Sequence, residues 1–239
     1  TETGRLVRDY AEEIFALGRE LEDSLRGDRH QAVPPLRVGL ANSIAKSAAA
    51  RLLLPALEVE PPARLVVREG DVSELLDELA RHRLEFVLTD QEPSPGSTRR
   101  TLTHRLGSCP VVMMGTPELV SRFKPGFPRS LDGAPLILPG RSSVVRRDLQ
   151  RWLAERDLHP RLVGEFDDSA MMKMFGEGGA GVFPVPTVAE RDVRRLYGAR
   201  RVGKLDGVED AFFAFSNPRF VPHPGIEAII AEGHERLHG

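Results

Sequence analysis

The chain has 239 residues and a formal net charge of −2 at pH 7, with 41% hydrophobic and 28% charged residues. This composition predicts a globular protein that needs no disulfides, and the single cysteine, Cys109, excludes an internal disulfide and a multi-cysteine zinc site. The near-neutral charge argues against binding to DNA or membranes by bulk electrostatics, and the absence of an apolar run of about 18 residues excludes a membrane-spanning helix.

The start of the chain predicts a fragment of a cytoplasmic protein. It begins Thr1-Glu2-Thr3-Gly4, and the first methionine is Met113, so we expect an N-terminal part to be missing. No signal-peptide pattern is visible. Cys109 is therefore expected to be a reduced, buried residue.

An amphipathic pattern predicts a long helix from Gly4 to Leu25. Its apolar residues recur at steps of three and four and form one stripe: Val7, Tyr10, Ile14, Leu17, Leu21 and Leu25. Such a stripe must be buried against something. Two interpretations stay open: the helix packs on its own domain, or it projects and pairs with a second subunit.

After Pro35, predicted strands and helices alternate. The first set has strands at Leu36–Leu40, Ala63–Arg68 and Phe86–Thr89, and helices at Ile44–Leu54 and Asp71–His82. Asp71 or Ser73 is expected to cap the second helix. Strands that alternate with helices of this length imply parallel pairing in an α/β sheet.

A second set of similar size starts near Ser108. The expected strands are Cys109–Met114, Leu136–Leu138, Arg161–Phe166, Gly181–Pro184 and Ala211–Ser216, and the expected helices are Glu118–Phe123, Ser143–Arg156, Ser169–Phe175, Pro186–Leu196 and Ile226–Leu237. We therefore expect a linker helix in residues 1–31, lobe I in residues 35–108 and 217–239, and lobe II in residues 109–216.

The sequence shows no known catalytic or nucleotide-binding motif in its required context. Gly176-x-Gly178-x-x-Gly181 has the spacing of the dinucleotide fingerprint, but it follows a helix and enters a strand, the reverse of the required order. We interpret it as a turn that uses glycine's freedom at positive φ. The sequence shows no nucleophile–base pair and no convincing metal spacing among its histidines, so no catalytic residue, cofactor or enzyme activity is predicted.

Short polar groups follow four of the predicted strands. They are Asn42-Ser43, Thr89-Asp90, Arg141-Ser142-Ser143 and Asp167-Asp168. Because ligands of open α/β sheets bind at the carboxyl ends of strands, these residues predict a small-ligand site between the lobes. The aspartates suit a cation and Arg141 suits an anion. Ser, Asn and Asp are also favoured helix N-caps, which explains part of the set without any ligand.

Several stretches resemble LysR-type transcriptional regulators. They are Arg8–Phe15, Val38–Ala41, Leu136–Ser143 and Gly164–Gly176. Within that family, the resemblance is to the sodium-responsive activators of sodium/proton antiporter genes. It implies two Rossmann-like lobes of the type 2 periplasmic-binding-protein fold, preceded by a linker helix. It further implies a dimer or tetramer paired through Gly4–Leu25, DNA binding by a missing winged helix-turn-helix domain, and sodium or lithium as an effector in the cleft.

Three classes of protein therefore stay open. The leading interpretation is the effector-sensing domain of a cytoplasmic transcriptional activator, with Asp90 and Asp168 as the first candidates for cation ligands. A solute-binding protein for a small anion or an amino acid shares the fold, but it needs an export signal and has no use for a pairing helix. An enzyme is the third class.

Overall fold

The computed structural model describes residues 35–92, 101–218 and 223–238, and from the first 34 residues only 1, 4, 7, 8, 11, 14, 15 and 18. All of these early residues except Thr1 are helical, and Val7 and Ile14 expose 61% and 67% of their surface. Tyr10, Leu17, Leu21 and Leu25 of the predicted stripe lie outside the described residues. The long linker helix therefore stays a prediction.

The strands of the described residues form two sheets. The larger has the order β2-β1-β3-β8-β4-β7, and the smaller pairs β5 with β6. Their bounds are β1 Leu36–Ala41, β2 Leu65–Gly70, β3 Phe86–Thr89, β4 Leu102–Gly115, β5 Pro135–Pro139, β6 Arg161–Phe166, β7 Phe183–Pro186 and β8 Arg200–Ser216. Parallel pairing is confirmed for β1 with β2 and β3. It is wrong as a general rule here, because β8 runs antiparallel to β3 and β4, and β7 antiparallel to β4.

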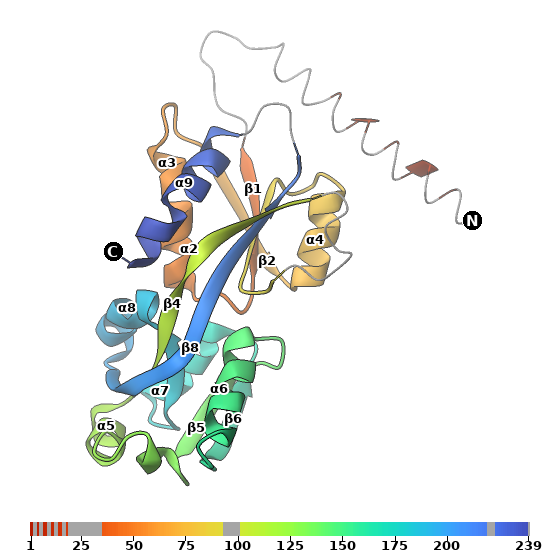
Figure 1. Cartoon of the computed structure of the whole chain (residues 1–239). Helices are drawn as coiled ribbons and strands as arrows, with labels where there is room; N and C mark the ends of the chain where they lie inside the picture. The colour runs from red at the N-terminus through yellow and green to blue at the C-terminus, as the bar shows by residue number, and fades with distance from the viewer. Residues whose placement is uncertain are drawn as a thin grey trace.

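Helices surround the strands of two lobes (Figure 1). In lobe I they are α2 Lys46–Leu53, α3 Pro55–Glu58, α4 Val72–Ala80 and α9 Pro224–His238; in lobe II they are α5 Pro117–Phe123, α6 Val144–Ala154, α7 Ser169–Glu177 and α8 Thr187–Tyr197, with a 3-10 turn at Arg129–Leu131. The predicted helix Ile44–Leu54 corresponds to α2, and Pro55 starts the separate short helix α3. Among the described residues, no helix combines the length and apolar character needed to cross a membrane.

Two long neighbouring strands, β4 and β8, run from one lobe into the other (Figure 1). Both begin well before the predicted strands at Cys109 and Ala211, because their first halves are too polar to be recognised from apolar runs. The predicted boundary after Ser108 falls inside β4, and β8 already pairs with β3 from Phe213 onward. The exact domain boundaries therefore stay a prediction.

The buried core continues from one lobe to the other. Its largest apolar cluster includes Leu36 and Phe86 of lobe I together with Phe183 and Val185 of lobe II. A second cluster around Trp152 lies within lobe II and includes residues of β4 and β8. The lobes are thus packed together at their bases, which leaves the loops at the strand ends to form the walls of a cleft.

Two glycines of the apparent fingerprint, Gly176 and Gly181, are required for close packing, whereas a Cβ at Gly178 would make only ordinary contacts. A Cβ at Gly176 would overlap the ring of Phe183, and a Cβ at Gly181 would lie 2.7 Å from the carbonyl oxygen of Pro135. The glycine with positive φ in this turn is Gly179, at 79°, which stands outside the fingerprint spacing. The predicted helix-to-strand turn is confirmed, whereas the predicted reason for its three spaced glycines is wrong.

Candidate ligand-binding site between the lobes

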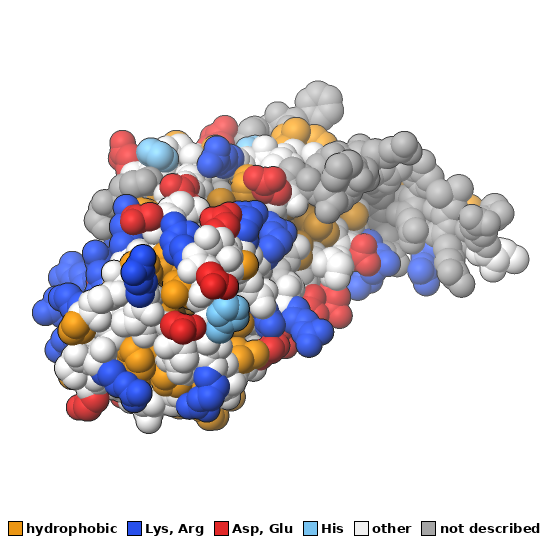
Figure 2. Space-filling model, turned by 60° about the horizontal axis from the view of Figure 1, so that its bottom comes forward, with side chains coloured by type: hydrophobic (Ala, Val, Ile, Leu, Met, Phe, Trp, Pro, Cys, Tyr) orange, Lys and Arg blue, Asp and Glu red, His pale blue; other side chains and the backbone are white. Residues whose placement is uncertain are grey.

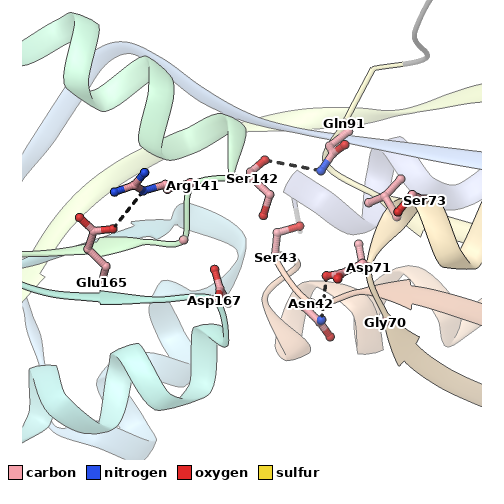
Figure 3. Close-up of a pocket in the computed structure, with 13 residues that line it drawn as sticks. Asn42, Ser43, Gly70, Asp71, Ser73, Gln91, Arg141, Ser142, Glu165 and Asp167 are labelled. Atoms are coloured by element: carbon pink, nitrogen blue, oxygen red, sulfur yellow. Dashed lines mark hydrogen bonds and ion pairs between the residues drawn. The ribbon is translucent and has the colours of Figure 1, made fainter.

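A cleft of about 930 Å³ separates the strand ends of the two lobes, a volume at the upper end of the range for small-molecule sites. Figure 3 shows side chains of both lobes facing each other across it. The cleft is lined by Ala41, Asn42, Ser43, Gly70, Asp71, Val72, Ser73, Gln91, Gly140, Arg141, Ser142, Glu165 and Asp167.

The lobe I wall is built from the ends of β1 and β2. These strands pair in parallel up to Ala41 and Gly70, so the residues that follow them emerge side by side. The Asn42 amide Nδ2 donates to Oδ1 of Asp71 at 3.5 Å. Asp71 stands at the N-cap position of α4, but its side chain makes no capping bond. Its carboxylate instead faces the cleft beside Asn42 (Figure 3).

The lobe II wall is stiffened by an ion pair. Arg146, which is 8% exposed, donates to both carboxylate oxygens of Glu165 at 2.8 and 3.0 Å and to the carbonyl oxygen of Pro139 at 3.1 Å. These hydrogen bonds lower the pKa of Glu165 below its usual value and raise that of Arg146. Arg141, whose side chain is 88% exposed, has its Nε 3.9 Å from Glu165 Oε2. Arg141 is therefore the cleft's exposed cation.

Two contacts join the walls across the cleft. The Gln91 amide donates to the carbonyl oxygen of Ser142 at 3.5 Å, as Figure 3 shows. The Asp90 carboxylate, at the end of β3 in lobe I, faces the backbone N–H of Val144, the first residue of α6 in lobe II, and this N–H lowers the pKa of Asp90. In both contacts, a polar side chain of lobe I thus faces a backbone group of lobe II.

A second, much smaller cavity of about 30 Å³ adjoins the cleft, and we call it the inner chamber. Ser43 lines both cavities. The inner chamber is lined by Ser43, Ala45, Asp90, Pro139, Ser143, Val145, Ser169, Met172, Lys173, Pro184, Pro186 and Asp210. Its wall therefore combines both lobes with a residue of the long strand β8.

The inner chamber contains three buried ionisable groups. Burial raises the pKa of Asp90, although hydrogen bonds from Ser43 and from backbone N–H groups partly oppose this. Burial, together with the charge of Asp90, raises the pKa of Asp210 well above its usual value. Burial lowers the pKa of Lys173 to about 8. Two side-chain oxygens here, Asp210 Oδ1 and Ser169 Oγ, have no hydrogen-bond partner.

Most of the nine predicted ligand-binding residues line the cleft or the inner chamber, and the other two have structural roles. Asn42, Ser43, Arg141, Ser142 and Asp167 line the cleft, and Asp90 and Ser143 line the inner chamber, together with Ser43. Thr89 and Asp168 appear in neither lining. Thr89 Oγ1 accepts from the backbone N–H of Gln91, and Asp168 caps α7 by accepting from the N–H groups of Ala170 and Met171.

Sequence reasoning missed Asp71, Ser73, Gln91, Glu165 and Asp210 as lining residues. Asp71 and Ser73 follow a predicted strand, so the strand-end rule applied to β2 as well would have found them. Asp210 lies inside a long strand, where no strand-end or capping signal marks it.

The structure also contains a serine–histidine contact. A ring nitrogen of His104 lies 2.9 Å from Ser216 Oγ. Ser216 is only 5% exposed, and neither residue lines the cleft or the inner chamber. Within the described part of the chain, no group of three or more His, Cys, Asp and Glu residues could hold a metal ion.

Comparison with known sequences identifies a family and two relatives. The model of the LysR substrate binding domain matches residues 29–233. The transcriptional activator protein NhaR of Escherichia coli (strain K12) and that of Shigella flexneri are each 29% identical over 240 residues. These alignments cover 99% of this chain and 77% of each relative.

Solved structures show the same fold. The reduced regulatory domain of OxyR2 from Vibrio vulnificus has a TM-score of 0.68 at 13% identity, covering 88% of this chain and 99% of that one. The apo regulatory domain of HypT from Salmonella typhimurium has a TM-score of 0.66 at 14% identity, covering 87% and 99%. The predicted fold class, two Rossmann-like lobes of the type 2 periplasmic-binding-protein fold, is confirmed.

Proposed function

The chain belongs to the LysR substrate-binding-domain family, and from this premise we propose that it is the effector-sensing and self-associating part of a DNA-binding transcriptional activator that responds to sodium or lithium. The single observation that carries the proposal is the cleft between two lobes of this fold, lined by polar groups at the strand ends of both. A ligand that contacts both walls binds one lobe arrangement more tightly than another. It can therefore shift the equilibrium between arrangements by that difference in affinity.

A small cation fits the oxygen-rich lining. Asp71 and Asp167 provide carboxylates from opposite walls, and Ser43, Ser73 and Ser142 provide hydroxyls. Oxygen ligands of this kind suit hard cations. The resemblance to sodium-responsive activators favours sodium or lithium among them. We further propose that such a cation controls the expression of a sodium/proton antiporter gene.

DNA binding is assigned to a winged helix-turn-helix domain outside the given residues. The relatives are longer than this chain, which covers 77% of them. On the face in Figure 2, Lys and Arg are mixed with Asp and Glu, and Arg201 and Arg195 of lobe II pair with Glu190 and Asp192. This surface therefore lacks the continuous basic stripe that nucleic-acid binding uses. A regulator of this kind works in the cytoplasm.

Self-association is proposed through the N-terminal helix. Val7 and Ile14 are exposed in the chain on its own, as the paired-helix interpretation requires. Two edge strands also expose apolar residues: Val66 and Val67 on β2, and Leu162 and Val163 on β6. Exposed apolar surface on strand edges favours contact with another copy. A solute-binding protein has no need of such surfaces, and the relatives are transcriptional activators.

The proposed function is tested by thermal melts in NaCl or LiCl against KCl and choline chloride at matched ionic strength, since salt alone screens surface charge within about 8–10 Å. A ligand at about ten times its dissociation constant adds roughly 1.4 kcal/mol, which raises the Tm of a chain this size by about 3–6 °C. We expect this rise in sodium or lithium only. Equal curves in all four salts contradict a cation response, and small carboxylates should then be screened against the Arg141 loop.

A further inference from the structure

The inner chamber has room for one water-sized guest. Its volume is about 30 Å³, above the roughly 10–15 Å³ that a cavity needs to hold one water. It lies where the β1 and β3 ends of lobe I meet the starts of α6 and α7 in lobe II. Asp210 of β8 completes the wall. The guest would therefore touch both lobes and the strand that connects them.

Two oxygens that line the chamber lack a partner. Ser169 is 9% exposed and Asp210 is 5% exposed, yet Ser169 Oγ and Asp210 Oδ1 make no hydrogen bond. A buried polar atom without a partner costs about 1–3 kcal/mol, so two of them lining one small cavity indicate that something normally occupies it. The occupant must be able to interact with a carboxylate oxygen and a hydroxyl oxygen at the same time.

The donor set favours a cation with a single charge. The other polar side chains of the chamber are Asp90, Ser43, Ser143 and Lys173, so the ligand atoms it offers a cation are oxygens from two carboxyls and three hydroxyls. A divalent metal site generally needs more acidic or imidazole ligands, and the described residues contain no suitable group of three. Lys173 supplies a positive charge of its own, which further disfavours a divalent ion.

We propose that the inner chamber binds one small monovalent cation, coordinated by the Asp210 carboxylate and the Ser169 hydroxyl. This inference rests on the proposed function and moves its sensor from the open cleft to the buried chamber. The carboxyl of Asp210 gives up its proton to solvent when the cation binds, so that the charge inside the chamber does not change. The cation gains two partners, and both unpartnered oxygens are satisfied.

Binding in the inner chamber couples the cation to the arrangement of the lobes. Ser169 belongs to lobe II, Ser43 and Asp90 belong to lobe I, and Asp210 pairs with Cys109 in the β4–β8 ladder where the chain crosses between them. An ion coordinated by Asp210 and Ser169, in a chamber that Ser43 and Asp90 of lobe I also line, fits only when these three parts are correctly spaced. Its binding energy therefore stabilises one lobe arrangement.

The test compares cation responses of variants of the whole 239-residue chain. Melts in NaCl, LiCl, KCl and choline chloride at matched ionic strength are recorded for the wild type, Asp210→Asn and Ser169→Ala. Asp206→Asn is the matched control, because Asp206 lies on the same strand with its side chain 81% exposed. Ser169→Ala keeps every charge and serves if Asp210→Asn fails to fold. Asp167→Asn reports on the cleft.

We expect a sodium- or lithium-specific Tm rise in the wild type and in Asp206→Asn. Asp210→Asn should lose this rise. Ser169→Ala, which lacks one contact to the cation, should bind the cation with an apparent affinity at least about tenfold weaker. A response that survives in Asp210→Asn and Ser169→Ala but disappears in Asp167→Asn overturns the inference and leaves the proposed function standing. A wild type without any cation-specific response overturns both, and the chamber then holds water.

Discussion

Ser43 and Asp90 form a side-chain hydrogen bond of 2.6 Å although 47 residues separate them in the chain. The bond exists because β1 and β3 are parallel neighbours, so the residues that follow them emerge at the same sheet edge. Ser43 lines the cleft and the inner chamber, and Asp90 faces the backbone N–H of Val144 in lobe II. One serine thus connects the open site, the buried chamber and the contact between lobes.

Ser43→Ala should destabilise the protein. Asp90 is 3% exposed, and the substitution removes a hydrogen bond to its carboxylate. The loss of a donor to a buried charged acceptor costs about 1–3 kcal/mol, and each kcal/mol lowers the Tm of a chain this size by about 2–4 °C. Thermal melts measure the change. Ser73→Ala is the control, because Ser73 is exposed in the same cleft, and a drop of equal size in both variants contradicts the prediction.

Asp210→Asn should stabilise the protein at neutral pH in choline chloride. The pKa of Asp210 is higher in the folded protein than in the unfolded chain, so the folded state keeps a proton that the unfolded chain releases. Wild-type stability therefore falls as pH rises above the unfolded pKa of about 3.9. The variant lacks this fall. Its Tm should exceed that of the wild type at pH 7 and approach it near pH 4. A difference that does not change with pH excludes this explanation.

Lys173→Met should also raise the Tm at pH 7. The pKa of Lys173 is about 8 in the folded protein, against about 10.4 in an unfolded chain. Below pH 8 both states carry the proton and the buried charge costs on the order of 3 kcal/mol; as pH rises from 8 to about 10.4, the wild type regains this stability. Melts across that range should show the advantage of the variant shrinking. Lys204→Met, at a largely exposed lysine, should show no such pH dependence.

Glu165→Gln should weaken the lobe II wall. The substitution leaves the buried guanidinium of Arg146 without its charged partner. Because Glu165 is itself partly exposed, we expect a loss of stability smaller than the cost of breaking a fully buried pair. Since the pKa of Glu165 is lowered by folding, its stabilisation is present above the unfolded pKa and lost as pH falls through the folded pKa.

Urea unfolding measures the cost of Glu165→Gln at pH 7 and again at acid pH. The wild type should lose more stability than the variant between pH 6 and pH 3. The control is Glu155→Gln, because the Glu155 side chain is 61% exposed beside Arg156. If both variants cost the same, the buried pair contributes nothing beyond an exposed one.

Ile14→Lys should disrupt self-association. Ile14 exposes 67% of its surface on the proposed pairing helix, and a lysine there would place charge in the apolar seam. Light scattering should give a dimeric mass for the wild type and a monomeric mass for the variant. Leu196→Lys on α8, where Leu196 is 61% exposed, should remain dimeric. A dimer that persists in Ile14→Lys moves the interface elsewhere.

The sequence predicted the elements whose patterns are local. β1, β3, β6 and the helix start at Ser143 follow from apolar runs and a capping residue, and the structure has them within a residue or two. The strand-end rule placed Asn42, Ser43 and Ser142 at the cleft because parallel neighbours end at one edge. Asp168 shows the rule's weakness, since its carboxylate caps α7 and lines neither cavity.

The rest depended on partners far along the chain. The first half of β8 is polar, so its strand character appears only through pairing with β4 across about a hundred residues. Asp210 lies just beyond the middle of the strand, and nothing local distinguishes it from Asp206 on the same strand. Its burial arises where β8 passes between the lobes, which is a property of the assembled fold.

The position of β8 has a consequence for how the protein is made. This strand supplies Phe212 and Phe215 to the buried clusters of lobe I, and Val202 and Leu205 to the cluster of lobe II. Among the strands of the described residues it is the last to leave the ribosome, and α9 follows it. Neither lobe can complete its core on the nascent chain before then. The two lobes therefore complete their cores together, once residues 200–216 have been made, and a chain cut short before residue 200 lacks the buried side chains that β8 contributes to both lobes.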